Sequence, residues 1–326
     1  MRVLVALGGN AMTGSDGSAR VEDQIAAAET AMEAVADLVA SGVEVVITHG
    51  NGPQVGNLLV KNELSAGVVP PVPLDWCGAQ TQATLGFVLM NALEPALARR
   101  GAARPVAAIV TRTLVDLDDP GFQRPSKPIG RYLPKEEAAV LIDHGQNFED
   151  RGVRGWRRVV ASPEPVEILD AGVVSTLADQ GYVVIANGGG GIPVVREPDG
   201  RLRGVEAVID KDLGAAVLAR SVGADRLVIA TDVDHAILDY GTDHARPIGS
   251  VAASIMRVYA AEGQFASGSM GPKVDAICAF VEASGQIGVI TSLTHIVDGV
   301  RGEVGTIVSP HGDSQIRPPA PHEERE

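Results

Sequence analysis

The feature that most constrains the fold of this chain is a series of short apolar runs separated by helical patterns. The runs cover residues 3–7, 43–48, 106–111, 159–161, 183–186, 227–230 and 287–291. Most of them show no alternation of apolar and polar residues, which is typical of strands buried on both faces. The helical patterns cover residues 22–39, 80–98, 211–222 and 272–283. Alternating strands and helices predict an α/β fold with a mainly parallel sheet and helices on both faces.

The composition fits such a fold and limits the partners. Hydrophobic residues make up 45% of the 326 residues and aromatic residues only 3%, so aliphatic side chains must form the core. A net charge of −14 argues against nucleic acid or an anionic membrane as partner, since both require a basic face. No run approaches the roughly 20 apolar residues of a membrane span, and no signal peptide precedes the first run. We therefore expect a soluble, cytoplasmic protein.

Unusual residues cluster where four of the predicted strands end. The carboxyl ends of parallel strands share one edge of the sheet, and ligands bind outside that edge. The clustered residues are Gly8, Gly9, Asn10, Gly50, Asn51, Gly52, Gly189, Gly190, Thr231 and Asp232. One glycine cluster is most often a tight turn, but four strand ends with unusual residues on one edge predict a ligand site.

Lysine is rare in this chain, and three of its five lysines lie in loop-like settings. They are Lys127, Lys211 and Lys273, in a chain with 22 arginines. The lysine ammonium is a compact point charge, whereas guanidinium is a broad planar fork. Phosphoryl transfer depends on crowding positive charge around the migrating group. We therefore interpret the three lysines as phosphoryl ligands; the alternative is that each is simply solvated.

Two of these lysines stand at the start of predicted helices. Asp212 follows Lys211, and we expect it to orient the lysines, although an acidic first turn is also what an ordinary capped helix shows. Met270 and Gly271 precede Lys273, and Pro272 is suited to a first helical turn. Free amides ahead of that helix would suit the β- and γ-phosphates of a nucleotide.

The first two glycine clusters lack arginine and lysine, which limits what they could hold. Their backbone N–H groups can form anion-binding nests. A substrate with a second carboxylate would usually need a charged fork, so these loops favour a small, planar, singly charged acceptor. Neither a Walker loop nor a dinucleotide fingerprint is present, which argues against P-loop kinases and Rossmann dehydrogenases.

Histidine and cysteine carry no comparable signal. The histidines are scattered without metal spacing, and we expect His49 to be structural. Cys77 and Cys278 form neither a disulfide framework nor a zinc pattern, and we expect Cys77 to pack in the core.

Residues 116–156 interrupt the alternation. The segment holds four prolines and four of the chain's eleven aromatic residues, which suggests an excursion with its own small core. It carries Lys127, so we interpret it as a lid or protruding subdomain inserted in a single domain of residues 1–308. The proline-rich tail, residues 309–326, is expected to be disordered.

Nine motifs in order resemble those of the carbamate kinases, which are members of the amino acid kinase family. The resemblance runs from residue 3 to about residue 308. The motifs lie at residues 8–11, 48–56, 74–80, 127–130, 157–163, 188–193, 209–212, 231–234 and 268–273. One departure is His235, where the family often has a small residue.

The resemblance implies a fold, a reaction and roles for residues. The fold is a three-layer αβα sandwich with an open, mainly parallel sheet of about eight strands and a protruding subdomain. The reaction is reversible phosphoryl transfer between ATP and carbamate, with Mg²⁺, in a homodimer. Lys127, Lys211 and Lys273 would neutralise the phosphoryl group and Asp212 would organise the lysines. The remaining implied contacts are Gly8, Gly9, Asn10, Gly50, Asn51 and Gly52 for carbamate, and Gly189, Gly190, Thr231, Asp232, Met270, Gly271 and Lys273 for the nucleotide.

Three alternatives stay open. The enzyme could make ATP during arginine breakdown or could supply carbamoyl phosphate for biosynthesis. A kinase of the same family could instead act on a larger carboxylate, which the uncharged nests disfavour. A nucleotide sensor without activity is the third alternative, and the three lysines together with Asp212 argue against it.

Overall fold

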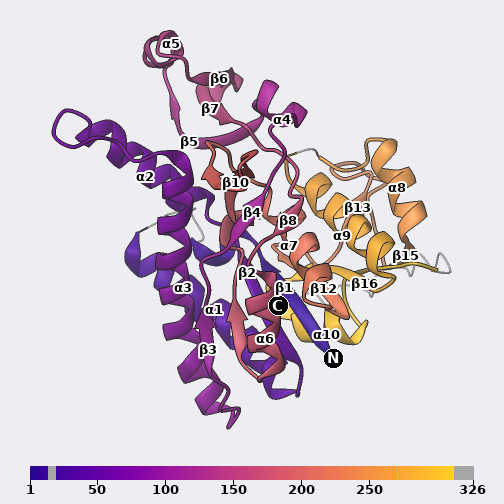
Figure 1. The fold of residues 1–326 in the computed structure, drawn as a ribbon. Helices are drawn as coiled ribbons and strands as arrows, with labels where there is room; N and C mark the ends of the chain where they lie inside the picture. Colours follow the sequence, from indigo (N-terminus) through magenta and orange to yellow (C-terminus); the bar gives the residue numbers. More distant parts are fainter. Residues whose placement is uncertain (14–19, 267, 312–326) are drawn as a thin grey trace.

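An eight-stranded sheet forms the centre of the computed structural model, which describes residues 1–13, 20–266 and 268–311 (Figure 1). The strand order is β15-β17-β16-β12-β1-β2-β9-β3. The strands are β1 (Arg2–Leu7), β2 (Glu44–His49), β3 (Val106–Ala108), β9 (Val183–Ile185), β12 (Arg226–Thr231), β15 (Ser250–Ala252), β16 (Ile287–Ser292) and β17 (Thr306–Ser309). Within the described part of this sheet, the pair β16–β17 is antiparallel, and β15 at the edge pairs parallel with β17. The predicted open, mainly parallel sheet is confirmed.

Helices cover both faces of this sheet, because its strands send alternate side chains into two cores. In β1, Leu4 and Ala6 join one core, while Val3, Val5 and Leu7 join the other. The first core is covered by α6 (Ala171–Asp179), α7 (Lys211–Ser221), α8 (Ala253–Ala261) and α9 (Met270–Ser284). The second is covered by α1 (Val21–Ala40), α3 (Leu74–Arg99) and α10 (Ile296–Arg301). This is a three-layer αβα arrangement.

A small antiparallel sheet protrudes beyond the main body, at the top of the view in Figure 1. It has the order β5-β7-β6 and consists of β5 (Lys127–Leu133), β6 (Asn147–Asp150) and β7 (Trp156–Val160), with α5 (Lys135–Asp143) beside it. The apolar run at residues 159–161 was expected in the main sheet, and this expectation is wrong. The run is followed by Pro163 and Pro165, which prevent the crossover helix that a parallel neighbour requires.

Aliphatic side chains, not the expected aromatic ones, anchor the protruding sheet. Ile129 and Val160 pack with Val55 and Leu59 of α2 (Gly52–Ser65), whereas Tyr132 is 37% exposed. The contact is close because glycines face each other: a Cβ at Gly56 of α2 would lie 3.3 Å from the Cα of Gly130. The protruding sheet therefore rests on α2.

The remaining elements complete the described chain. They are α4 (Pro120–Gln123), a four-stranded sheet of β11 (Leu202–Gly204), β10 (Ile192–Arg196), β4 (Arg112–Leu114) and β8 (Glu167–Ile168), and the pair β13 (Ile237–Leu238) and β14 (Arg246–Pro247). The last strand ends at Ser309, inside the predicted tail, and residues 312–326 lie outside the described part. Among the described helices, none has the length and apolar character to cross a membrane.

Candidate active site

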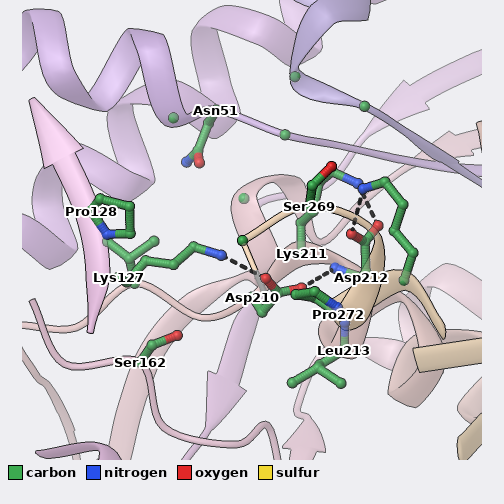
Figure 2. Close-up of a pocket in the computed structure, with 18 of the residues that line it drawn as sticks. Asn51, Lys127, Pro128, Ser162, Asp210, Lys211, Asp212, Leu213, Ser269 and Pro272 are labelled. Atoms are coloured by element: carbon green, nitrogen blue, oxygen red, sulfur yellow. Dashed lines mark hydrogen bonds and ion pairs between the residues drawn. The ribbon is translucent and has the colours of Figure 1, made fainter. Parts of the chain in front are cut away.

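A cleft of about 960 Å³ opens at the carboxyl edge of the main sheet, where the sequence predicted a ligand site (Figure 2). It brings together residues that are far apart in the sequence. The predicted residues that line it are Gly8, Gly9, Gly50, Asn51, Gly52, Lys127, Gly189, Lys211, Asp212, Thr231, Asp232 and Lys273. All three loop lysines therefore share one cleft.

Four other predicted residues do not line the cleft or cannot be placed in it. Gly190, Met270 and Gly271 are not among its lining residues, and Asn10 lies in the turn Gly9–Met12 with its side chain outside the described part. The amide of Gly271 was expected to be free, but it donates to the Ala266 carbonyl at 2.9 Å. That amide is already used to form the turn before α9.

Two of the lysines share one buried carboxylate. Asp212, the second residue of α7, pairs through Oδ1 with the Nζ of Lys211, and its Oδ2 lies 3.0 Å from the Nζ of Lys273 on α9. The side chains of both lysines are 14% exposed and that of Asp212 is 4% exposed. Because α7 and α9 pack against each other, the two ammonium groups are held by the main body.

Burial and charge shift the pKa values of this cluster in opposite ways. Burial disfavours the ammonium and lowers the pKa of Lys211, although Asp212 partly offsets this. Burial alone would raise the pKa of Asp212, but the charges of Lys211 and Lys273 outweigh it and lower that pKa. Asp212 is therefore an ionised carboxylate that keeps two ammonium groups close together.

The third lysine reaches the cleft from the protruding sheet. The Nζ of Lys127 lies 2.5 Å from the Oδ2 of Asp210, and Figure 2 shows this contact. The other oxygen of Asp210 caps α7, because it accepts from the amide of Asp212 at 2.9 Å. Sequence reasoning missed Asp210 as a site residue. Its place immediately before a helix predicts the cap but not the lysine.

Glycines form the floor beneath the lysines. A Cβ at Gly50 would lie 3.2 Å from the Cδ of Lys211 and 3.3 Å from the Cα of Gly9, so a side chain at Gly50 would be crowded. The amide of Gly8 donates to the Ala230 carbonyl at 3.0 Å and that of Gly50 donates to a β1 carbonyl, so both extend the sheet. At the start of α2, the backbone N–H groups of Gly52 and Gln54 have no partner inside their own helix and suit an anion, whereas Pro53 between them has no N–H.

Two buried side chains support this floor from below. The Nδ1 of His49 donates to the Gly50 carbonyl at 3.0 Å, and burial lowers the pKa of His49 to about 4, so the ring is neutral. The Nδ2 of Asn51 donates to Thr81 of α3 at 2.9 Å. Gly189, with φ of +66°, passes so close that a Cβ would lie 2.1 Å from that Nδ2. The glycine-rich turn Gly188–Gly190 therefore fits against the floor.

The remaining predictions concern the residues expected near the nucleotide, the departure at His235, and Cys77. The Oγ1 of Thr231 donates to the Oδ1 of Asp232 at 3.0 Å, where β12 ends in the cleft. Burial lowers the pKa of His235, and its neighbour Asp234 lies 2.8 Å from the Nδ1 of His295. Cys77 is buried and packs beside α2, as expected.

Comparison with known proteins gives matches over nearly the whole chain. The family model of the amino acid kinase family matches residues 1–292. The carbamate kinase of Thermococcus kodakarensis is 45% identical over 94% of this chain and 98% of its own length. The carbamate kinase of Trichomonas vaginalis is 42% identical over 95% of this chain and 100% of its own length. A solved carbamate kinase from Giardia lamblia bound to AMP-PNP is 39% identical, with a TM-score of 0.89 over 94% of this chain and 98% of that one.

Proposed function

This chain belongs to the amino acid kinase family, and we propose that it is a carbamate kinase, which transfers a phosphoryl group reversibly between ATP and carbamate. The observation that carries the proposal is the convergence of Lys127, Lys211 and Lys273 on one cleft. The floor of that cleft is made of glycine backbone without a cationic side chain, which suits an acceptor as small as carbamate. The names of the relatives point to the same substrate.

The reaction needs positioning and charge neutralisation more than acid–base chemistry. A carbamate oxygen is already anionic, so it attacks the γ-phosphorus without a general base. The new bond joins that oxygen to phosphorus, the bond to the β–γ bridging oxygen breaks, and ADP leaves with the electron pair. The amides at the start of α2 would orient the carbamate for this in-line attack.

The lysines would stabilise the migrating phosphoryl group. Lys211 and Lys273 are largely desolvated, so their charges act strongly across the cleft. Asp212 keeps them at a fixed spacing, and Lys127 approaches from the opposite wall. The same charges would stabilise the transition state in both directions.

The donor set of the cleft suits Mg²⁺ that arrives with a nucleotide. Mg²⁺ bound to phosphates keeps several waters and takes only one or two protein carboxylates. Asp232 lies in the cleft at the end of β12, and its carboxylate could serve as such a ligand. Bound there, Mg²⁺ would supply further neutralisation of the phosphate charge.

We extend the proposal to a cytoplasmic homodimer that makes ATP during arginine breakdown. Trp76 and Phe87, three turns apart on one face of α3, are 60% and 58% exposed, and such apolar exposure is typical of an interface. Both cysteines are buried and free, as is usual in a reducing compartment. Carbamoyl phosphate is a reactive acyl phosphate, which favours transfer to ADP; its supply for biosynthesis is the alternative.

The direct test is formation of ATP from ADP and carbamoyl phosphate, with acetyl phosphate as the control substrate. We expect ATP with carbamoyl phosphate and at least about a hundredfold less with acetyl phosphate, since a methyl group cannot replace the hydrogen bonds of the carbamoyl amide. A larger substrate from a panel of amino acids and their acyl derivatives, preferred in an ADP-release assay, would contradict carbamate as acceptor. Binding of ADP without any turnover would favour a nucleotide sensor.

A further inference from the structure

A second pocket, of about 590 Å³, lies between the start of α2 and the protruding sheet. Three arginines line it: Arg20 at the N-cap of α1, Arg131 on β5 and Arg157 on β7. They come from three elements that are separate in the sequence. In a chain with a net charge of −14, three guanidinium groups gather around one opening, and the carboxylates of Glu63 and Glu137 near Arg131 offset only part of their charge.

Two of these arginines keep donors available for a ligand. The guanidinium of Arg157 lies over the ring of Tyr132, 5.0 Å from its centroid, and its Nη1 donates to the Tyr132 hydroxyl at 3.4 Å, but its buried Nε has no hydrogen-bond partner in the described part of the chain. The Nη2 of Arg131 lies 3.8 Å from Glu63 and 3.7 Å from Glu137, too far for a hydrogen bond to either carboxylate. The planar guanidinium fork matches phosphate oxygens.

The pocket adjoins the lysine cleft. Gly52, Pro53 and Pro128 line both the pocket and the cleft. An anion in the pocket therefore lies next to the glycine floor where the phosphoryl acceptor would bind. The first turn of α2 lines the pocket, so the partial positive charge at the N-terminus of this 14-residue helix also favours an anion there.

We propose that this pocket is a second oxyanion site, which holds a phosphate-type dianion beside the cleft. Its chemistry fits two sources. One is carbamoyl phosphate before it enters the cleft, an assignment that rests on the proposed function. The other is free inorganic phosphate, which would bind whatever the substrate of the cleft is.

The first test is a calorimetric titration of inorganic phosphate into the full chain saturated with AMP-PNP, whose own phosphates occupy the lysine cleft. We expect one bound phosphate, and an affinity at least about tenfold lower in Arg131→Gln and in the double variant Arg131→Gln/Arg157→Gln. Arg131 exposes 54% of its side chain, so its replacement should leave the fold intact. The control is Arg201→Gln, an exposed arginine whose Nε pairs with Asp199, two residues away, and it should bind phosphate normally. Absence of phosphate binding, or equal binding by Arg131→Gln, would overturn the proposal.

The second test distinguishes the two sources. If carbamoyl phosphate uses the pocket, Arg131→Gln raises KM for carbamoyl phosphate at least about fivefold and leaves KM for ADP unchanged. If free phosphate uses it, KM stays unchanged, and the effect of added phosphate on the wild-type rate is lost in the variant. Either result supports the site, whereas a variant that matches wild type in both respects contradicts it. The phosphate titration does not require turnover, so a failure of the proposed function would be recognised separately.

Discussion

The two walls of the cleft hold their lysines in different ways. On the main-body side, Lys211 and Lys273 are 14% exposed and share the buried Asp212. On the protruding side, Lys127 is 32% exposed and pairs with Asp210, whose other oxygen caps α7. The body thus provides a fixed pair of charges, while the third charge depends on the position of a separate small sheet.

The two walls therefore differ in how much the fold depends on the charges that they hold. A buried pair of ammonium groups is costly without its carboxylate, so changes on the body side should reduce both activity and stability. The Lys127–Asp210 pair, with side chains 32% and 14% exposed, is less buried and contributes less to stability, so changes on the protruding side should affect mainly turnover.

The largest effect is expected for Lys211→Met. Loss of one desolvated charge at the migrating group should lower kcat by about 10²- to 10³-fold, while the circular dichroism spectrum stays unchanged. Lys61→Met, at an exposed position of α2, is the matched control. Near-normal turnover in Lys211→Met would remove this lysine from the mechanism.

Asp212→Asn should damage stability as well as activity. It leaves two close ammonium groups without a counter-charge, so the free energy of unfolding should fall by about 3 kcal/mol and kcat by at least about a hundredfold. Urea denaturation measures the first effect, with the exposed Asp243→Asn as control. If the variant unfolds at the same urea concentration as wild type, Asp212 does not hold the two ammonium groups of the main body in place.

The buried His49 should make the free energy of unfolding depend on pH. Its pKa is about 4 in the fold against 6.5 for a free histidine, so the unfolded chain binds a proton that the folded chain does not between these values. Stability should therefore decrease as pH falls, by about 2 kcal/mol between pH 6.5 and 5.

Urea denaturation at both pH values should show a smaller decrease in His49→Asn than in wild type. His144→Asn, at an exposed position, should behave like wild type. An equal decrease in wild type and His49→Asn would show that another group is responsible.

Asp210→Asn should have a smaller effect, confined to turnover. Asparagine still caps a helix but no longer holds the Lys127 ammonium by charge. We expect kcat to fall about five- to tenfold with the free energy of unfolding within about 0.5 kcal/mol of wild type. A loss of stability as large as in Asp212→Asn would erase the contrast between the two walls.

Removal of the chain from His311 onward should have the smallest effect. The main sheet is complete at Ser309, which pairs with Ala252 of β15. We expect kcat and KM within about twofold of wild type. A large loss of activity would assign the tail a role in the reaction.

The sequence predicted the main sheet and its ligand edge because both have local signals. Buried parallel strands are short apolar runs, and the clusters after Leu7 and His49 follow directly from where those runs end. The helical patterns identified in the sequence did not include α2, which begins at Gly52 and Pro53. Proline in a first helical turn was the signal that could have revealed it.

Pairings between distant segments could not be predicted in this way. Lys127 and Asp210 are 83 residues apart, and nothing near either residue specifies the other. The strand β7 was assigned to the wrong sheet because an apolar run alone does not identify its neighbours. Both features depend on tertiary packing of the protruding sheet on α2.

A crystal structure with ADP, Mg²⁺ and aluminium fluoride, an analogue of the migrating phosphoryl group, would show whether all three lysines contact that group together. We predict that the Nζ atoms of Lys127, Lys211 and Lys273 all lie within about 3 Å of the analogue's outer atoms. Contact from Lys211 and Lys273 alone, with Lys127 still on Asp210, would contradict joint neutralisation by the two walls.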